Sequence, residues 1–178
     1  MGASTGGFTQ VLLELGAEHV VALDVGHDQL APAVRLDPRV EERSGVSIRT
    51  VGPEDLEPVD VVVADLSFIS LTLIADTLRS LLKPSGQAVV LVKPQFEVGR
   101  RRLGKSGVVR SAADRRDAVI TVTETLRTAG LAPSGLLASP TPGTTGNHEY
   151  LLWTCGSAVL HTDEVHARAR EMTDEEAE

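Results

Sequence analysis

The pattern that most constrains the fold is a series of short, β-branched apolar runs that alternate with helical segments. The run Val61–Ala64 lies between Asp60 and Asp65, and its continuous apolarity predicts a strand buried on both faces of a parallel sheet. Comparable runs lie at His19–Asp24 and Gln87–Val92. Their alternation with helical segments over short connections predicts an α/β fold with a doubly wound, mostly parallel sheet.

The other elements are predicted from periodicity and turn residues. Helices are expected at 9–15, 29–36, 71–82 and 112–129, and further strands at 46–51, 131–139 and 148–154. The last two strands are joined by a loop of hairpin length with no helix in it, so they should run antiparallel. From Gly156 onward the chain is polar and acidic, and we expect a frayed helix or a disordered tail over 156–178.

Composition limits the class of protein. A length of 178 residues with 42% hydrophobic content fits one domain, placed here over 1–155. The net charge of −8 argues against nucleic-acid binding through the overall field, although a local basic patch could still bind. Cys155 is the only cysteine, and neither a signal peptide nor a membrane span is recognisable, so a cytoplasmic setting is expected. His27 and His148 lack partners at metal-ligand spacing, so no metal is predicted.

A glycine-rich turn, Gly2 to Gly7, precedes the first helical segment, and Asp24 ends the strand that follows. Glycines let the backbone approach a ligand closely, and a carboxylate at this spacing suits a pair of ribose hydroxyls. The glycines alone fit a plain tight turn equally well, but Asp24 makes a nucleoside-type ligand the favoured interpretation. The glycine spacing is not the Gly-x-Gly-x-x-Gly of nicotinamide dehydrogenases, which are the weaker alternative.

Three charged residues are predicted to meet at one edge of the sheet. Asp65 and Lys93 follow successive parallel strands, and Glu149 begins a strand of opposite direction. Groups of mixed sign in a cleft perturb one another's pKa, and a lysine partly withdrawn from water can act on a hydroxyl. A purely structural salt-bridge cluster is the alternative.

The segment from 98 to 110 has no clear period and concentrates positive charge among glycines. In an acidic chain this loop is the best candidate for contact with RNA phosphates, although a solvated mobile loop explains it equally well. The candidate RNA-binding residues are Arg100, Arg101, Arg102, Lys105 and Arg110.

Four motifs carry a resemblance to a known family: Gly2-Ala-Ser-Thr-Gly-Gly-Phe-Thr9, Ala64-Asp-Leu-Ser-Phe-Ile-Ser-Leu71, Leu91-Val-Lys-Pro-Gln-Phe-Glu97 and Gly146-Asn-His-Glu-Tyr150. They are similar to the motifs of the TlyA, or hemolysin A, family of ribosomal RNA 2'-O-methyltransferases, which are related to FtsJ. The resemblance implies a Rossmann-like methyltransferase sheet with a final antiparallel strand. It also implies methyl transfer to a ribose 2'-hydroxyl of ribosomal RNA, with cytidine as the expected nucleotide.

The resemblance further implies a Lys-Asp-Lys-Glu tetrad, of which Asp65, Lys93 and Glu149 stand at matching positions. Lys93 would activate the hydroxyl, Asp65 would orient Lys93, and Glu149 would hold the ribose or tune Lys93. The implied cofactor is S-adenosyl-L-methionine, and the implied partner is ribosomal RNA or a ribosomal subunit, without a membrane. The residues expected to bind the cofactor are Gly2, Ala3, Ser4, Thr5, Gly6, Gly7, Phe8, Asp24, Val25, Ser47, Asp65 and Leu66.

The chain departs from the family pattern before its first glycine. Family members usually carry an S4 RNA-binding domain, the first tetrad lysine and a first strand, so this sequence resembles an N-terminally truncated methyltransferase domain. The missing strand is expected between the His19–Asp24 and Asp60–Asp65 strands, and we expect weak or no activity from the chain itself. The open alternatives are a noncatalytic RNA- or ribosome-binding module and a small-molecule O-methyltransferase.

Overall fold

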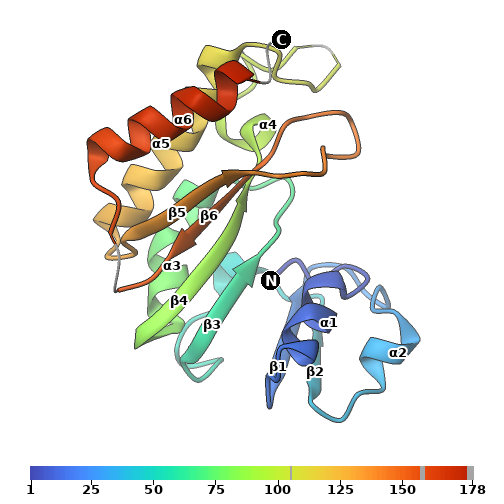
Figure 1. The fold of residues 1–178 in the computed structure, drawn as a ribbon. Helices are drawn as coiled ribbons and strands as arrows, with labels where there is room; N and C mark the ends of the chain where they lie inside the picture. Colours follow the sequence, from blue (N-terminus) through green and yellow to red (C-terminus); the bar gives the residue numbers. More distant parts are fainter. Residues whose placement is uncertain (105, 157–158, 176–178) are drawn as a thin grey trace.

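The computed structural model describes residues 1–104, 106–156 and 159–175, and its strands form two separate sheets (Figure 1). The strands are β1 Val20–Asp24, β2 Val40–Ser44, β3 Val59–Ala64, β4 Leu82–Val92, β5 Pro133–Ala138 and β6 Tyr150–Thr154. The helices are α1 Gly7–Glu14, α2 Pro32–Arg35, α3 Ala75–Ser80, α4 Pro94–Glu97, α5 Ala112–Thr128 and α6 Thr162–Glu175, with 3₁₀ turns η1 Ile48–Thr50 and η2 Leu71–Leu73. β1 and β2 form one sheet, and the other has the order β3-β4-β6-β5.

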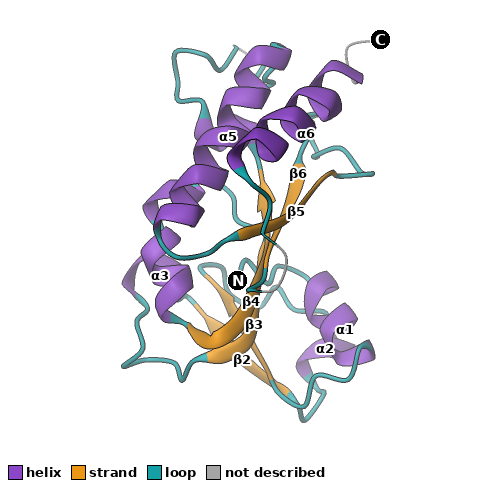
Figure 2. Cartoon of the chain, turned by 60° about the vertical axis from the view of Figure 1, so that its left-hand side comes forward, coloured by secondary structure: helices purple, strands orange, loops and turns teal. Residues whose placement is uncertain are grey.

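The four-stranded sheet contains the main core. β3 and β4 are parallel, with Ala64 opposite Val90, and β6 runs antiparallel to both β4 and β5, as predicted. The helices α3, α5 and α6 lie on one face of this sheet (Figure 2). Side chains of Val90 and Val92 point to that face and are fully buried, as is Leu126 of α5. Removal of this apolar surface from water provides most of the stability of the domain.

The opposite face of the sheet is more exposed than the sequence predicts. Val61 of β3 is 43% exposed, and Trp153 and Leu137 lie on the same face with 42% and 65% exposure. The predicted burial of Val61–Ala64 on both faces is therefore wrong for Val61. The reason is that the described helices packed on this sheet cover its other face, and β4 is the only described strand that pairs with β3.

The third predicted strand is misplaced. The sequence predicts a strand at 46–51, but the strand is β2, which pairs with β1 from Val40 opposite Val20 to Ser44 opposite Asp24. β2 is an edge strand whose residues are all half-buried, so it carries no apolar run for the sequence to reveal. Ile48 is buried instead within η1. The helix expected over 71–82 is likewise divided into η2 and α3.

The C-terminal segment packs on the domain. Val165 and Ala169 of α6 are fully buried, and Arg116 of α5 donates to Asp174 at 2.6 Å. The expectation of a frayed or disordered tail is therefore wrong for residues 162–175, because α6 completes the layer beside α5. Residues 157–158 and 176–178 lie outside the described part. None of the described helices is long and apolar enough to cross a membrane.

A cavity of about 810 Å³ separates the two sheets, lined by β1, β3 and the first residues of the chain. The backbone of Met1 donates to Val63 O at 2.8 Å and accepts from Asp65 N at 3.1 Å, which is parallel pairing with the β3 edge. Ala3 N donates to Leu23 O of β1 at 3.1 Å. Residues 1–3 thus connect the two sheets at one end of the cavity.

We predict that Val165→Ala lowers the free energy of unfolding by about 2 kcal/mol, because it removes buried methyl groups and leaves a small cavity. Val159→Ala is the control, since Val159 is 44% exposed and its truncation should cost little. Urea denaturation monitored by circular dichroism measures both values. Equal stability of the two variants would mean that α6 does not pack on the domain.

Candidate active site

Asp65 and Lys93 form an ion pair at the carboxyl ends of β3 and β4. Their side chains are 33% and 13% exposed, and Lys93 Nζ lies 2.5 Å from Asp65 Oδ1. Lys93 Nζ also donates to Ser67 Oγ at 3.4 Å. The two residues meet because β3 and β4 are parallel neighbours, so the loops after them leave the same edge. A partly buried, charge-assisted contact of this kind fixes the lysine in one direction.

Glu149 lies at the same edge but is held by a different partner. It precedes Tyr150, which pairs with Val92, so Glu149 stands one position beyond the ladder just as Lys93 does on β4. Its side chain is buried, and its Oε1 accepts from Gln95 Nε2 at 2.9 Å. A Cβ on Gly143 would lie 2.5 Å from Glu149 Oε1, so a larger residue there would displace the Glu149 carboxylate. The structure therefore brings all three predicted charged residues to one edge.

Sequence reasoning missed Glu97, which joins the loops after β3 and β4. Its Oε2 accepts from Ser70 Oγ at 2.5 Å and its Oε1 accepts from Leu71 N at 2.9 Å. Burial raises the pKa of Glu97 above its ordinary value, and the two hydrogen bonds partly oppose that rise. The partners are separated by 26 and 27 positions in the sequence, so no local pattern could have revealed the contact.

The loop between Ser67 and Ser70 carries an exposed aromatic ring. Phe68 is 91% exposed, and its φ of 64° lies in the left-handed region, which is rare for a bulky residue. Its ring lies against that of Phe96 of α4, with centroids 5.1 Å apart. Glu97 and the Phe68–Phe96 contact together hold this loop beside the Asp65–Lys93 pair.

The glycine-rich turn spans the distance between the ends of β3 and β1. At Gly2, with φ of 66°, a Cβ would lie 2.0 Å from Asp65 O, so only glycine permits this approach. Ser4 N donates to Asp24 Oδ2 and Gly26 N donates to Asp24 Oδ1, each at 2.8 Å. Asp24 therefore holds the turn in place at the carboxyl end of β1.

The other predicted cofactor residues lie around this turn. Val25 is 67% exposed directly after Asp24, and Leu66 packs close to Gly2. Val46 N donates to Asp24 O at 3.0 Å, which brings the neighbouring Ser47 to the same edge. The remaining predicted residues, Ala3, Ser4, Thr5, Gly6, Gly7 and Phe8, form the turn itself and the first residues of α1.

The structure has room for a ligand at this turn. A Cβ on Gly7 would meet no atom within 4 Å, and Gly7 begins an eight-residue helix with unpaired backbone N–H groups. An open backbone, helix N–H donors and the Asp24 carboxylate are groups that suit a nucleoside carrying a charged substituent. The residues present therefore fit an adenosyl cofactor. The large cavity between the sheets reaches this turn, because Gly2, Ala3 and Phe8 line it, but Asp24 and Lys93 do not.

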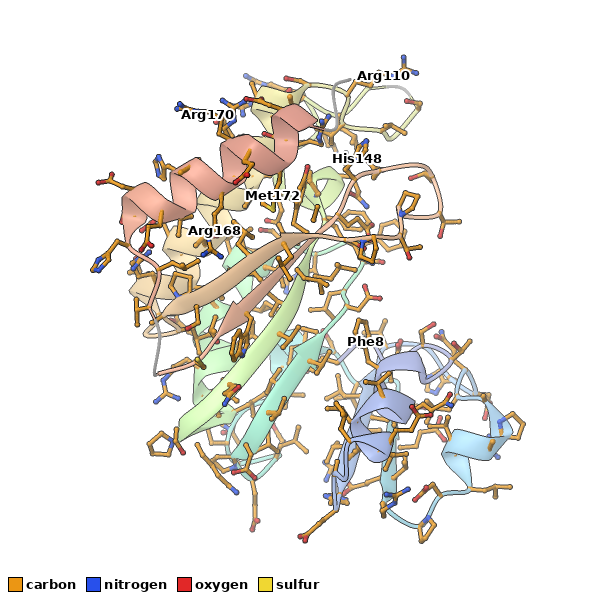
Figure 3. All side chains as sticks on the ribbon, in the orientation of Figure 1. Phe8, Arg110, His148, Arg168, Arg170 and Met172 are labelled. Atoms are coloured by element: carbon orange, nitrogen blue, oxygen red, sulfur yellow. The ribbon has the colours of Figure 1, made fainter. Side chains whose placement is uncertain are left out.

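The basic loop contains both exposed and paired arginines. Arg100, Arg101 and Arg110 are exposed, and Figure 3 shows Arg110 at the same end of the molecule as His148. Arg102 instead pairs with Asp114 at 3.4 Å and Asp117 at 3.0 Å on α5. Arg102 is thus less available for RNA than the sequence predicts, because α5 begins close to it. Lys105 lies outside the described residues.

Comparison with known proteins supplies a family context. The profile of the FtsJ-like methyltransferases matches residues 1–155. The 16S/23S rRNA (cytidine-2'-O)-methyltransferase TlyA of Mycobacterium tuberculosis is 48% identical over 153 residues, which cover 85% of this chain and 57% of that protein. The chain thus spans little more than half the length of this relative.

Solved structures with the same fold extend the comparison. A structure from Streptococcus thermophilus described as a hemolysin candidate is 38% identical with a TM-score of 0.86, covering 99% of this chain and 66% of that one. A Burkholderia thailandensis N-methyltransferase, solved with S-adenosylhomocysteine, has a TM-score of 0.60 at 19% identity, covering 86% of this chain and 68% of that one. The architecture is therefore a Rossmann-like methyltransferase fold.

We predict that Glu97→Gln becomes more stable relative to the original chain as pH rises. Because the folded state raises the pKa of Glu97, the stability contributed by its protonation is present below the ordinary pKa and disappears as pH rises through the raised value. Glutamine does not titrate and can keep both contacts. Thermal unfolding between pH 4 and 8 measures the difference, with exposed Glu57→Gln as the control. A difference in stability between Glu97→Gln and the original chain that does not vary with pH would contradict a raised pKa for Glu97.

Proposed function

Because the chain belongs to the FtsJ-like methyltransferase family, we propose that it transfers a methyl group from S-adenosyl-L-methionine to a ribose 2'-hydroxyl of ribosomal RNA, with cytidine as the nucleotide. The observation that carries this proposal is the Asp65–Lys93 ion pair, which lies at the strand ends beside the glycine turn. A charged pair that can act on a hydroxyl, beside a turn that suits an adenosyl group, supports the proposal. Ribosomal RNA as the target also implies action in the cytoplasm.

The cofactor would supply an electrophilic methyl group on a sulfonium. In the transfer, an oxygen–carbon bond would form, the sulfur–carbon bond would break to release a neutral thioether, and the hydroxyl proton would pass to water. Lys93 lies where its N–H groups can orient the hydroxyl oxygen and stabilise the negative charge that develops on it. Asp65 orients Lys93, and its carboxylate also favours a positive group at the neighbouring turn.

Glu149 is proposed to hold the substrate ribose. Gln95 occupies its Oε1, which leaves Oε2 for a hydroxyl of the incoming nucleotide. Gly2 to Phe8 would contact the methionine part of the cofactor, Asp24 its ribose hydroxyls, and Val25 and Ser47 the adenine side. Exposed arginines at 100, 101 and 110 support a polyanionic substrate over a small molecule in a chain of net charge −8.

We predict that Asp24→Asn weakens S-adenosylmethionine binding about tenfold or more, because it removes the charge that anchors the turn and faces the ribose. Asp28→Asn is the matched control, since Asp28 lies in the same loop but pairs with Arg35 at the surface. Calorimetric titration gives both dissociation constants. Similar affinity in the two variants would place the cofactor elsewhere.

We predict that Lys93→Gln lowers the rate of methyl transfer at least about 100-fold while cofactor affinity changes little. The assay uses labelled S-adenosylmethionine, unmethylated ribosomal RNA and enzyme in excess, so that even the weak activity expected from the sequence is resolved. Lys83→Gln is the control, because Lys83 pairs with Asp60 at the opposite ends of β3 and β4. Full activity of Lys93→Gln would remove Lys93 from the chemistry, and RNA binding without any transfer would favour the noncatalytic alternative.

A further inference from the structure

We propose that Asn147 is a positioning residue that fixes the described part of the basic loop, residues 98–104 and 106–110, against the turn that carries Glu149. Through this contact one buried amide would set the place where RNA phosphates bind relative to the reacting ribose. The inference deepens the proposed function and rests on it, since it assigns the basic loop to the RNA substrate.

The side-chain amide of Asn147 is buried, and all of its hydrogen-bonding groups have partners. It is 1% exposed, its Oδ1 accepts from Val109 N at 2.9 Å, and its Nδ2 donates to Gly107 O at 3.0 Å. The second Nδ2 hydrogen is donated to Thr145 Oγ1 at 2.9 Å. A buried amide has few alternatives to such bonds, because an unpaired polar group away from water is costly. Asn147 therefore holds backbone groups of the loop that lie 38 and 40 positions before it in the sequence.

The backbone of Asn147 connects the same contact to the catalytic edge. Gly143 N donates to Asn147 O at 2.9 Å, and Gly143 is the residue that packs directly against the Glu149 carboxylate. Ser139 N donates to Glu149 O at 2.8 Å, which closes the turn. Asn147 thus lies between the basic loop on one side and the wall of the Glu149 site on the other.

The basic loop is anchored at Arg102 and at its last residue, whereas several of its charges remain exposed. Arg102 pairs with α5, and buried Arg115 donates to Arg110 O at 3.0 Å. The side chains of Arg100, Arg101 and Arg110 make no hydrogen bond or ion pair with any residue that the structure describes. Charges carried on a backbone already held in place lose less conformational freedom when they bind phosphates. The arrangement is therefore suited to an ordered polyanion.

The test compares Asn147→Ala with Thr145→Ala, which removes one partner of the amide but leaves both bonds to the loop. Trypsin cleavage after Arg100 or Arg101 should accelerate about fivefold or more in Asn147→Ala, because the loop opens more often. The dissociation constant for a ribosomal RNA fragment should rise about tenfold, and the salt dependence should become shallower by roughly 0.7 to 0.9 for each phosphate that the loop no longer binds. Cofactor affinity should stay the same, and Thr145→Ala should resemble the original chain.

A double-mutant cycle separates positioning from general destabilisation. In an Arg100→Ala/Arg101→Ala/Arg110→Ala background, Asn147→Ala should weaken RNA binding by less than about twofold, since the exposed charges through which it acts are gone. An undiminished effect in that background would overturn the proposal, as would an unchanged cleavage rate. Asn147→Asp keeps the acceptor for Val109 N and should be intermediate, so it serves if the alanine variant fails to fold.

Failure of this inference is distinguishable from failure of the proposed function. If Arg100→Ala/Arg101→Ala/Arg110→Ala leaves RNA affinity unchanged, these arginines do not contact RNA and the proposal for Asn147 is overturned. Cofactor binding and methyl transfer by the original chain are measured independently of the loop variants. They decide whether the chain is a methyltransferase in either case.

Discussion

The parallel pairing of β3 with β4 is the constraint on which the rest of the site depends. It places Asp65 and Lys93 at adjacent strand ends, where their side chains meet at 2.5 Å. The antiparallel return of β6 adds Glu149 to the same edge, and the loops after β3 and β4 are joined there by Glu97. Each of these contacts follows from strand direction, so a change of register by one residue would separate the charged groups.

The sequence was sufficient to predict which charged residues meet at the carboxyl edge of the sheet, but not the contacts that stabilise this site. Asp65 and Lys93 could be placed because buried parallel strands appear as continuous apolar runs that stop at a charged residue. Glu97 and Asn147 could not be assigned their roles, because their partners lie 26 to 40 positions away and no periodicity records such pairs. The sequence likewise predicts that Arg102 is free to bind RNA, because its ion pair with Asp117 of α5 is a tertiary contact that no sequence pattern reveals.

Errors in the predicted fold occurred where burial and apolarity do not coincide. β2 is half-buried at the edge of a sheet and carries three charged residues, so it has no strand signal, whereas Ile48 is buried in a 3₁₀ turn. α6 contacts the domain through Val165 and small residues such as Ala169, within an acidic segment. Composition alone therefore suggested a tail where the structure has a packed helix.

The two sheets are joined at the glycine turn, and this connection matters for function. Asp24 anchors the turn to β1, and the close approach of Gly2 to Asp65 anchors it to β3. The proposed cofactor site therefore depends on contacts from both sheets, although a cavity of about 810 Å³ lies between them. Binding at this turn should stabilise the relative position of the two sheets, because a ligand that contacts both favours the state in which both are in place.

The most direct test of the account is a titration of S-adenosylhomocysteine followed by amide chemical shifts. The account predicts saturable shifts at Gly2 to Phe8, at Asp24 to Gly26 and at Asp65 and Leu66, with a stoichiometry of one ligand per chain. Shifts confined to cavity residues away from the turn, such as Glu57, Pro58 and Lys83, or no shifts at all, would contradict the assignment of a methyltransferase site to the carboxyl edge of the sheet.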